Sequence, residues 1–390
     1  MRMSSSHQEW RCPHDMQSPQ PWRIITEDAV SASFGLAADD ALTVCAGRGE
    51  SQPTLRLYTY SSHCALVGRF QRVENEIHQE WCRAHGIAIN RRPTGGGAIL
   101  MGDDQLGVAL MVAGPRGDVY GQARVWMEKF SASLVTALGS LGIRAQFRGK
   151  NDIEVGGRKI AGLGIYRATG GGLLFHASLL VDLDVPLMLQ VLNTPFEKIS
   201  DKEIDSVASR ISTVRRESGN GISVDEVRRM VAAAYSATWD VELVPGDFTQ
   251  SEWKAIAALE REKYRTDEWI FQTTDVPDAA GSAKRKTPGG LLDVRVALAG
   301  RMLKMVLLAG DFFAADASVR ELEAALRWHP SAPDAVAATV HEVYAQNPAG
   351  WHAISADDLT ETIQLAIERS ELAENRTESH PYGCFVPVGR

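Results

Sequence analysis

The sequence predicts an α+β fold, in which a mixed or antiparallel β-sheet core is covered by helices and a second, small α+β domain follows. Three patterns lead to this expectation. Residues 173–184 alternate as a strand does, residues 122–141 repeat apolar side chains at helical spacing, and the chain after Trp269 turns polar, with prolines and glycines. We therefore expect an N-terminal arm at 1–21, a first domain at 22–272, a linker at 273–289, a second domain at 290–372 and a tail at 373–390.

The first half of the chain predicts a helix, then strands around a glycine loop. The alanine-rich stretch 29–46 has apolar residues at near-helical spacing, and LRLYTY at 55–60 is a strand candidate. IAIN leads into RRPTGGG and AILM leaves it, so the glycines are expected to join two antiparallel strands at the end of a sheet.

The middle of the chain predicts a covering helix and further strands. The helix at 122–141 is expected to stop at Gly142 and cover a sheet with one apolar face, formed by Trp126, Phe130, Leu134, Leu138 and Leu141. Gly156 and Gly157 lie between DIEV and RKIAGLGIY, which predicts a hairpin. In 173–184 the alternation separates Phe175, Ala177, Leu179 and Val181 from His176 and Ser178 on the other face.

The second domain is predicted to open with a hairpin and continue with helices. Val294, Val296 and Leu298 alternate toward a turn at Ala299-Gly300, and RMLKMVLLAGDFF follows. Apolar pairs at helical spacing then recur after residue 320, and Ser355 is a candidate helix cap.

Composition excludes several classes of function. A net charge of −8 argues against a general nucleic-acid binder, because phosphate contacts need a basic surface. Five cysteines show no zinc-ligand spacing, which predicts a reducing compartment, and the apolar stretches are too short to span a membrane. We expect a cytoplasmic protein with no nucleic-acid and no membrane partner. Without a GxGxxG after a strand or a GxxxxGK[ST], a dinucleotide fold or a P-loop is not expected either.

The stretch RRPTGGGAIL at 91–100 predicts an anion site. Three glycines together are costly to order unless something must approach the main chain closely, and exposed N–H groups beside an arginine suit a phosphate or carboxylate. A flexible hairpin tip with two solvated arginines is the alternative. Lys159, in a strand of apolar and glycine neighbours, is either a solvated hairpin lysine or a fixed cation that faces the same anion as Arg92.

Three motifs in order resemble a known family. RRPTGGGAIL, GKNDIEVGGRKIAG and FHASLLVDLD look like the RRxSGGGAV, RNDI, GRKISGSA and HHGTLL motifs of the lipoate-protein ligases, within the biotin/lipoate attachment-enzyme group. EKISDKEIDSVASRISTV, KYRTDEWIFQT and the segment after residue 289 extend the resemblance more weakly, the last to the family's accessory domain.

The resemblance implies a two-step reaction with ATP, Mg²⁺ and lipoate. Lipoate is first adenylated with release of pyrophosphate, and a lysine of a lipoyl domain or glycine-cleavage H-type acceptor protein then takes the lipoyl group. Lys159 matches the family's catalytic lysine, which we expect to act as a cation rather than as a base. Asp152 is a candidate Mg²⁺ ligand, with an Asx turn as the alternative. The implied ATP and lipoyl-adenylate site comprises Arg92, Thr94, Gly95, Gly96, Gly97, Ala98, Asn151, Asp152, Lys159 and His176.

The lipoyl tail needs an apolar slot, for which Arg69, Phe70, Ile99 and Leu66 are candidates. The chain departs from the family pattern at Met101, Gln105, Gly164 and Phe175, and we expect these changes to remove polar groups near the acyl end. Acyl specificity is therefore left open between lipoate and octanoate.

Three other functions stay open. Octanoyl transfer within the same fold needs a cysteine at the active site, but no cysteine lies beside the GRKIAG strand. Biotin ligation is disfavoured because a GRGRxxR-type loop is absent. A homologue that binds lipoate without catalysis is the third alternative. For His176 itself, the alternative to a site role is an ordinary core histidine.

Overall fold

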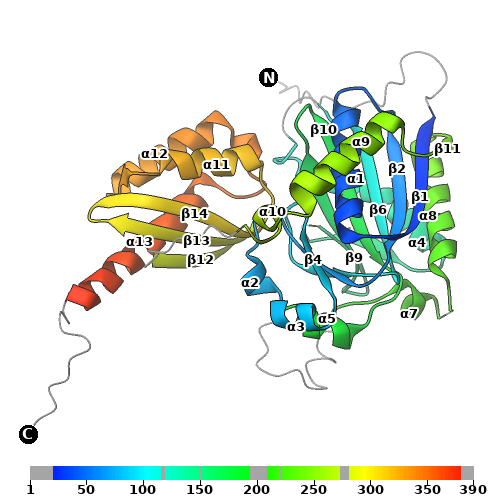
Figure 1. Cartoon of the computed structure of the whole chain (residues 1–390), viewed down its shortest axis with the longest axis horizontal. Helices are drawn as coiled ribbons and strands as arrows, with labels where there is room; N and C mark the ends of the chain where they lie inside the picture. Colours follow the sequence, from blue (N-terminus) through cyan, green and yellow to red (C-terminus); the bar gives the residue numbers. More distant parts are fainter. Residues whose placement is uncertain are drawn as a thin grey trace, which may run out of the picture.

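The structure is a computed structural model that describes residues 21–115, 119–149, 151–193, 209–219, 221–272 and 281–378. Two domains are visible in Figure 1, a larger one built from the first two-thirds of the chain and a smaller one from the last third. The predicted α+β class is confirmed. The calls made for residues 1–20, for residues 197–208 of the motif segment 197–214 and for residues 379–390 lie outside the described residues.

The larger domain is built on an eight-stranded mixed sheet with the order β11-β1-β2-β6-β10-β9-β8-β7. Strands β11, β1 and β2 run parallel, and every pairing from β2 to β7 is antiparallel. The strands are β1 (Trp22–Val30), β2 (Thr54–Tyr60), β6 (Gln105–Ala113), β7 (Ala145–Arg148), β8 (Asp152–Val155), β9 (Arg158–Arg167), β10 (Gly172–Leu180) and β11 (Leu243–Pro245).

Helices cover both faces of this sheet. Helices α4 (Ala123–Ser140) and α8 (Val224–Trp239) pack on one face, where Phe130 meets Phe175 of β10 at a ring distance of 5.6 Å. The predicted apolar face of α4 is buried, and Gly142 follows the helix in a left-handed conformation. Between β8 and β9, Gly156 and Gly157 both have positive φ, as a two-residue hairpin turn requires. These expectations are confirmed.

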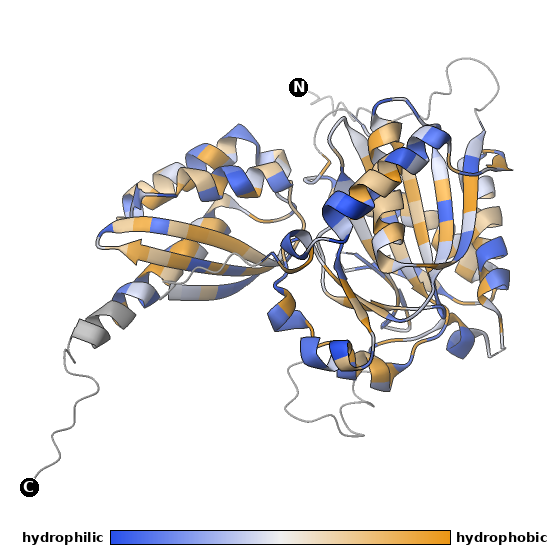
Figure 2. Cartoon of the chain, viewed as in Figure 1, coloured by the Kyte–Doolittle hydropathy of each residue, from blue (hydrophilic) through white to orange (hydrophobic). Residues whose placement is uncertain are grey.

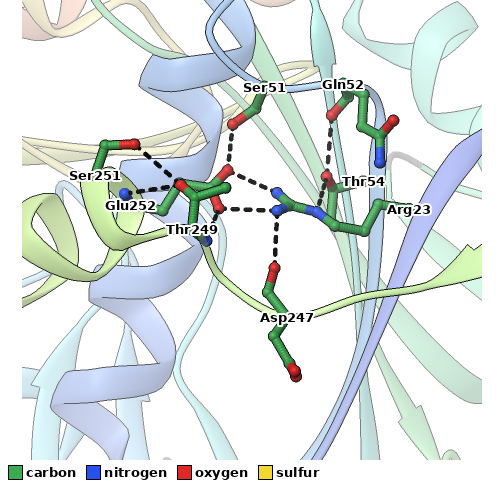
Figure 3. Close-up of polar contacts among 8 residues, drawn as sticks. All are labelled: Arg23, Ser51, Gln52, Thr54, Asp247, Thr249, Ser251 and Glu252. Atoms are coloured by element: carbon green, nitrogen blue, oxygen red, sulfur yellow. Dashed lines mark hydrogen bonds and ion pairs between the residues drawn. The ribbon is translucent and has the colours of Figure 1, made fainter.

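Helices α1 (Ala32–Gly47) and α9 (Gln250–Leu259) cover the other face. A buried ion pair fastens α9 to the sheet: Arg23 of β1 donates to both carboxylate oxygens of Glu252, at 2.8 and 2.7 Å (Figure 3). Ser51 also donates to Glu252, and Thr249 caps the helix through the same carboxylate. The pair therefore ties the two ends of the larger domain together.

A three-stranded sheet, β4-β3-β5, stands apart from the main sheet. The glycine loop joins β4 (Ala88–Arg91) to β5 (Ile99–Met101), but β3 (Cys64–Val67) lies between them, parallel to β4 and antiparallel to β5. The expected hairpin tip is thus a connection across an intervening strand. The short helices near this sheet are α2 (Val73–Glu76), α3 (Gln79–Ala84), α5 (Val185–Val191) and α10 (Asp267–Phe271). A further short helix, α7 (Val214–Ser218), packs Val214 into the core of the main sheet.

The smaller domain has a four-stranded sheet, β12-β13-β14-β15, under three helices. Figure 2 shows apolar residues along β14, in line with a core formed between this sheet and the helices. The elements are β12 (Gly281–Thr287), β13 (Gly290–Ala299), β14 (Met302–Phe312), β15 (His329–Pro330), α11 (Asp316–Ala325), α12 (Pro333–Gln346) and α13 (Ala356–Glu378).

Part of the expected linker is wrong. Residues 281–287 form strand β12, because Ala283 and Thr287 are buried while the lysines between them point outward, and this alternation pairs with β13. Lys284 lies 3.5 Å from Asp293, and Arg285 pairs with Asp358 of α13. The charged run therefore belongs to the small domain. Residues 288–289 form the turn between β12 and β13, and residues 273–280 of the predicted linker lie outside the described part of the chain.

Within the described ranges, no helix is both long enough and apolar enough to cross a membrane.

Candidate active site

A cavity that is open to solvent lies between the glycine loop and the main sheet. One row of paired residues crosses its floor: Gly162 on β9, Ser178 on β10, Gly107 on β6 and Tyr58 on β2. Three strand spacings separate the ends of this row, which is about 14 Å. The polar side chains stand at the β9 and β10 end, and the aromatic ones stand at the β2 end.

The two glycines in this row make room for large side chains. A Cβ on Gly162 would lie 2.9 Å from Lys159 Nζ, and a Cβ on Gly107 would lie 2.8 Å from the ring of Tyr58. Lys159 therefore leans over the polar end of the floor, while Tyr58 lies over the apolar end.

Lys159 and Arg92 line the same cavity. The Lys159 ammonium lies 2.8 Å from Asp152 Oδ1, and its side chain is about one-third exposed. The strand around it is held by backbone bonds to Arg210 and Ser212. Lys159 is thus neither freely solvated nor buried, which leaves its charge available to a ligand.

The two arginines of the glycine loop have different partners, and neither is solvated. Arg91 donates to several backbone carbonyls, among them those of Gly68, Gln71 and Trp269. Its role is therefore structural, because it holds these two segments of the chain together. Arg92 lines the cavity and donates to the carbonyls of Leu66 and Gly97 at 2.6 and 2.7 Å. Burial lowers the pKa of Arg91 to about 9 and that of Arg92 to about 10, so both are charged at neutral pH.

The second domain reaches the glycine loop directly. A Cβ on Gly95 would lie 2.0 Å from the carbonyl oxygen of Phe312, and Gly96, at φ +101°, faces the ring of Phe313. The backbone amide of Gly310 donates to the carbonyl of Phe70 at 2.8 Å. The GDFF segment at 310–313, which resembles a turn of the family's accessory domain and was expected to be structural, packs on this loop, and Phe312 also lies in the core of the small domain.

His176 is held between Thr94 and Gly164. Its Nε2 lies 3.0 Å from Thr94 Oγ1, and a Cβ on Gly164, its partner across β9, would lie 2.3 Å from the same nitrogen. Burial, with a smaller contribution from Arg92, lowers the pKa of His176 to about 3. The imidazole is neutral at working pH and acts by hydrogen bonding.

Most of the predicted binding residues come together. The cavity is lined by Arg92, Gly95, Gly96, Gly97, Ala98, Ile99, Asn151, Lys159 and His176, together with Leu66. Thr94 and Asp152 lie behind this lining and hold His176 and Lys159, respectively.

Arg69 and Phe70, expected in the lipoyl pocket, are not among the residues that line this cavity. The ring of Phe70 stacks on that of Phe312 at 4.7 Å and belongs to the core of the small domain. Arg69 lies over Trp269 and pairs with Asp316 of α11. Both residues follow β3 directly, and the chain there turns toward the second domain rather than into the cavity.

The departures from the family pattern are not all at the acyl end. Met101 lines the cavity, and Gly164 makes space for His176. Phe175 points to the opposite face of β10 and packs on Phe130, and buried Gln105 donates to the carbonyl of Asp182. The expectation that Phe175 and Gln105 change the pocket is therefore wrong, because strand alternation turns Phe175 away from it.

Sequence reasoning missed the aromatic end of the cavity. Leu36, Tyr58 and Tyr60 line it. Tyr58 donates to Asp39 Oδ2 at 2.9 Å, and Arg56 donates to the other oxygen of that carboxylate, Oδ1, at 2.8 Å. The i, i+2 spacing of two tyrosines in LRLYTY was the available signal. It marks one face of a strand but not which ligand that face meets.

None of the three cysteines in the described ranges lines the cavity. Cys45, Cys64 and Cys82 are all buried, and burial raises the pKa of each thiol. Cys12 and Cys384 lie outside those ranges.

Comparison with known proteins bears on this arrangement. The family model described as "Lipoyl protein ligase A/B catalytic domain" matches residues 31–236. Among curated relatives, the octanoyltransferase LipM of Brevibacillus brevis is 28% identical over 64% of this chain and 98% of its own length. The lipoate-protein ligase LplJ of Bacillus subtilis is 26% identical over 66% of this chain and 76% of its own length.

Solved structures agree with the fold. The chain resembles a bipartite lipoate protein ligase from Thermoplasma acidophilum, described with its E2 lipoyl domain, at TM-score 0.58 and 27% identity over 64% of this chain and 96% of the other. A lipoate-protein ligase A bound with ATP matches at TM-score 0.56 and 25% identity, over 65% of this chain and 99% of the other. LipL1 of P. falciparum in complex with lipoate gives 0.67 over 88% and 99%, at 15% identity, which is a likeness of fold alone.

Proposed function

Because this chain belongs to the lipoyl protein ligase A/B catalytic domain family, and is thus an enzyme of the lipoate ligase and octanoyltransferase group, we propose that it is an ATP-dependent lipoate-protein ligase. One observation carries the proposal. Lys159 and Arg92 face a single cavity that has loop glycines and two cations at one end and aromatic side chains at the other. Such a cavity suits a carboxylic acid with an apolar tail, because the cations can hold its carboxylate next to a phosphate while the aromatic side chains exclude water from the tail.

In the first step, a carboxylate oxygen of lipoate attacks the α-phosphorus of ATP, and the bond to the pyrophosphate oxygen breaks. Two anions must approach each other, so fixed cations have to replace the lost hydration. Lys159 lines the cavity and would contact both the carboxylate and the α-phosphate oxygens, while Arg92 donates to the carbonyl of Gly97 and would hold the loop beside them. Mg²⁺ bound with ATP would neutralise phosphate charge, and Asp152 is the carboxylate next to Lys159 that would hold it.

In the second step, the amine of an acceptor lysine attacks the acyl carbon of the mixed anhydride. The bond to the phosphate oxygen breaks, AMP leaves, and the nitrogen gives up a proton as the amide forms. Lys159 stays beside the same oxygens and stabilises the charge that passes back to the phosphate. The acceptor we propose is a lipoyl domain or an H-type protein, and the cytoplasmic location expected from the cysteines belongs to the same proposal.

Two observations favour the ligase over an octanoyltransferase. A transferase needs a nucleophile for an acyl thioester, and no cysteine of the described ranges lines the cavity. The match to LipM covers 98% of LipM but only 64% of this chain. The match to LplJ covers 76% of LplJ, so about a quarter of LplJ lies outside the matched part. A second domain that touches the glycine loop thus suits the ligase better.

The test combines the full chain with ATP, Mg²⁺, lipoate and a lipoyl domain, and follows pyrophosphate together with the mass of the acceptor. We expect ATP-dependent addition of one lipoyl group. Lys159→Ala should abolish it and keep a normal circular dichroism spectrum, while Lys254→Ala, an exposed lysine on α9, should behave as the unaltered chain.

Modification of the acceptor from octanoyl-acyl carrier protein without ATP would move the assignment to the transferase. Lipoate binding without pyrophosphate release or transfer would instead support the non-catalytic homologue.

A further inference from the structure

We propose a second site in the larger domain, a divalent transition-metal site formed by His63, Asp103 and Asp104. It does not depend on the proposed ligase function. One ligand atom from each residue lies within 4.8 Å of the other two, as a single ion of that class requires after small adjustments.

Two atoms of this cluster contact each other only as an ion pair. His63 Nε2 and Asp104 Oδ1 lie 3.6 Å apart, and both atoms are shielded from solvent without a hydrogen bond. Shielded polar atoms are seldom left without a hydrogen bond, and an ion held between these two would satisfy both. The Asp103 carboxylate is exposed and leaves open positions for water.

Two turns bring the ligands together, and Gly102 allows it. His63 comes from the turn between β2 and β3, and the aspartates come from the turn between β5 and β6. A Cβ on Gly102 would lie 2.7 Å from the His63 ring and 3.0 Å from Asp104 Oδ1, so any other residue would push the ligands apart. The nearby Asp182 is occupied by Arg215.

The ligand types select the metal. One imidazole with two carboxylates suits Zn²⁺ or a neighbouring first-row ion, whereas Mg²⁺ and Ca²⁺ prefer oxygen ligands alone.

The site lies behind the acyl end of the cavity. The amide of Tyr60 donates to the carbonyl of Gly102 at 3.2 Å, and Tyr60 and Met101 both line the cavity. A bound ion would therefore cross-link the two turns that carry these side chains and stiffen that end of the pocket.

The experiment titrates Zn²⁺ into the metal-free full chain by calorimetry and records thermal unfolding with and without Zn²⁺. Asp103→Asn is the decisive variant, since it removes one ligand and leaves the contact between His63 and Asp104. His341→Gln is the matched control, because His341 pairs with Asp357 on the small domain at 3.1 Å without a third ligand.

We expect one ion per chain, with affinity at least about tenfold weaker in Asp103→Asn and in His63→Gln, and a zinc-induced rise in Tm that both variants lose. His341→Gln should keep both. The proposal is overturned if millimolar Zn²⁺ does not bind. It is equally overturned if Asp103→Asn binds as the unaltered chain does, which would make the cluster a simple ion pair or place the ion elsewhere.

Discussion

Gly95 of the glycine loop and Phe312 of the second domain touch through their backbones: a Cβ on Gly95 would lie 2.0 Å from the Phe312 carbonyl oxygen. The missing side chain at this position thus admits a neighbouring domain. Gly96 and Gly97 also line the cavity, and a Cβ on them would lie 3.5 Å from the Phe313 ring and 3.6 Å from Asp311 of the second domain, respectively.

Gly95→Ala should therefore harm both stability and catalysis. Both contacting atoms belong to main chains, so neither can rotate away, and the loop or the second domain must shift. We expect a loss of about 1–3 kcal/mol in the free energy of unfolding and a fall in pyrophosphate release of about a hundredfold.

Gly139→Ala in α4 is the control for this variant. Apart from the helix's own backbone, nothing lies within 4 Å of the added Cβ. The variant should therefore gain about 0.5–1 kcal/mol in the free energy of unfolding measured in urea, without a change in activity. Equal stability of the two variants would refute the domain contact.

His176 should not titrate in the pH range where the enzyme works. Its pKa is lowered to about 3, below the usual 6.5, so its contribution to stability is complete above pH 6.5 and is lost as the pH falls toward 3. The free energy of unfolding, measured in urea, should therefore fall more steeply between pH 6.5 and 3 for the unaltered chain than for His176→Gln. An imidazole that titrates near its usual pKa by NMR would contradict the buried, neutral state.

Gly164→Ala should displace the His176 ring, because the new Cβ would lie 2.3 Å from Nε2. The bond to Thr94 would then break, and a ring that helps to shape the phosphate end would move. We expect about a tenfold or greater loss of kcat/KM. A crystal structure of the variant with the His176–Thr94 distance unchanged at 3.0 Å would rule this account out.

Acid should weaken the ion pair between Arg23 and Glu252. Burial alone would raise the pKa of Glu252, but hydrogen bonds from Arg23, Ser51 and Thr249 outweigh burial and lower it to about 2. Its stabilisation, on the order of 3 kcal/mol, is present above pH 4.5 and is lost as the pH falls toward 2.

Glu252→Gln should remove that dependence and should itself cost about 3–5 kcal/mol, because Arg23 would be left buried with its charge unpaired. Thermal unfolding from pH 7 to 2 checks both expectations. Parallel pH profiles of the two proteins would show that another carboxylate dominates acid unfolding.

The sequence by itself determined the local chemistry. The motifs around Arg92, Lys159 and His176, the two-glycine hairpin and the apolar face of α4 depend on residues close together in the chain, so spacing alone predicts them. The resemblance then suggested the reaction that we propose.

Only the tertiary structure decided what these residues face. Strand β3 separates the two strands that the glycine loop joins, and Phe70 turns into the small domain. Tyr58 lines the same cavity as Lys159, although their strands are three strand spacings apart in the sheet. Strand β12 also replaces part of a polar linker. Each of these outcomes depends on pairing and burial between residues far apart in the chain, and their energies do not appear in any local pattern of side chains.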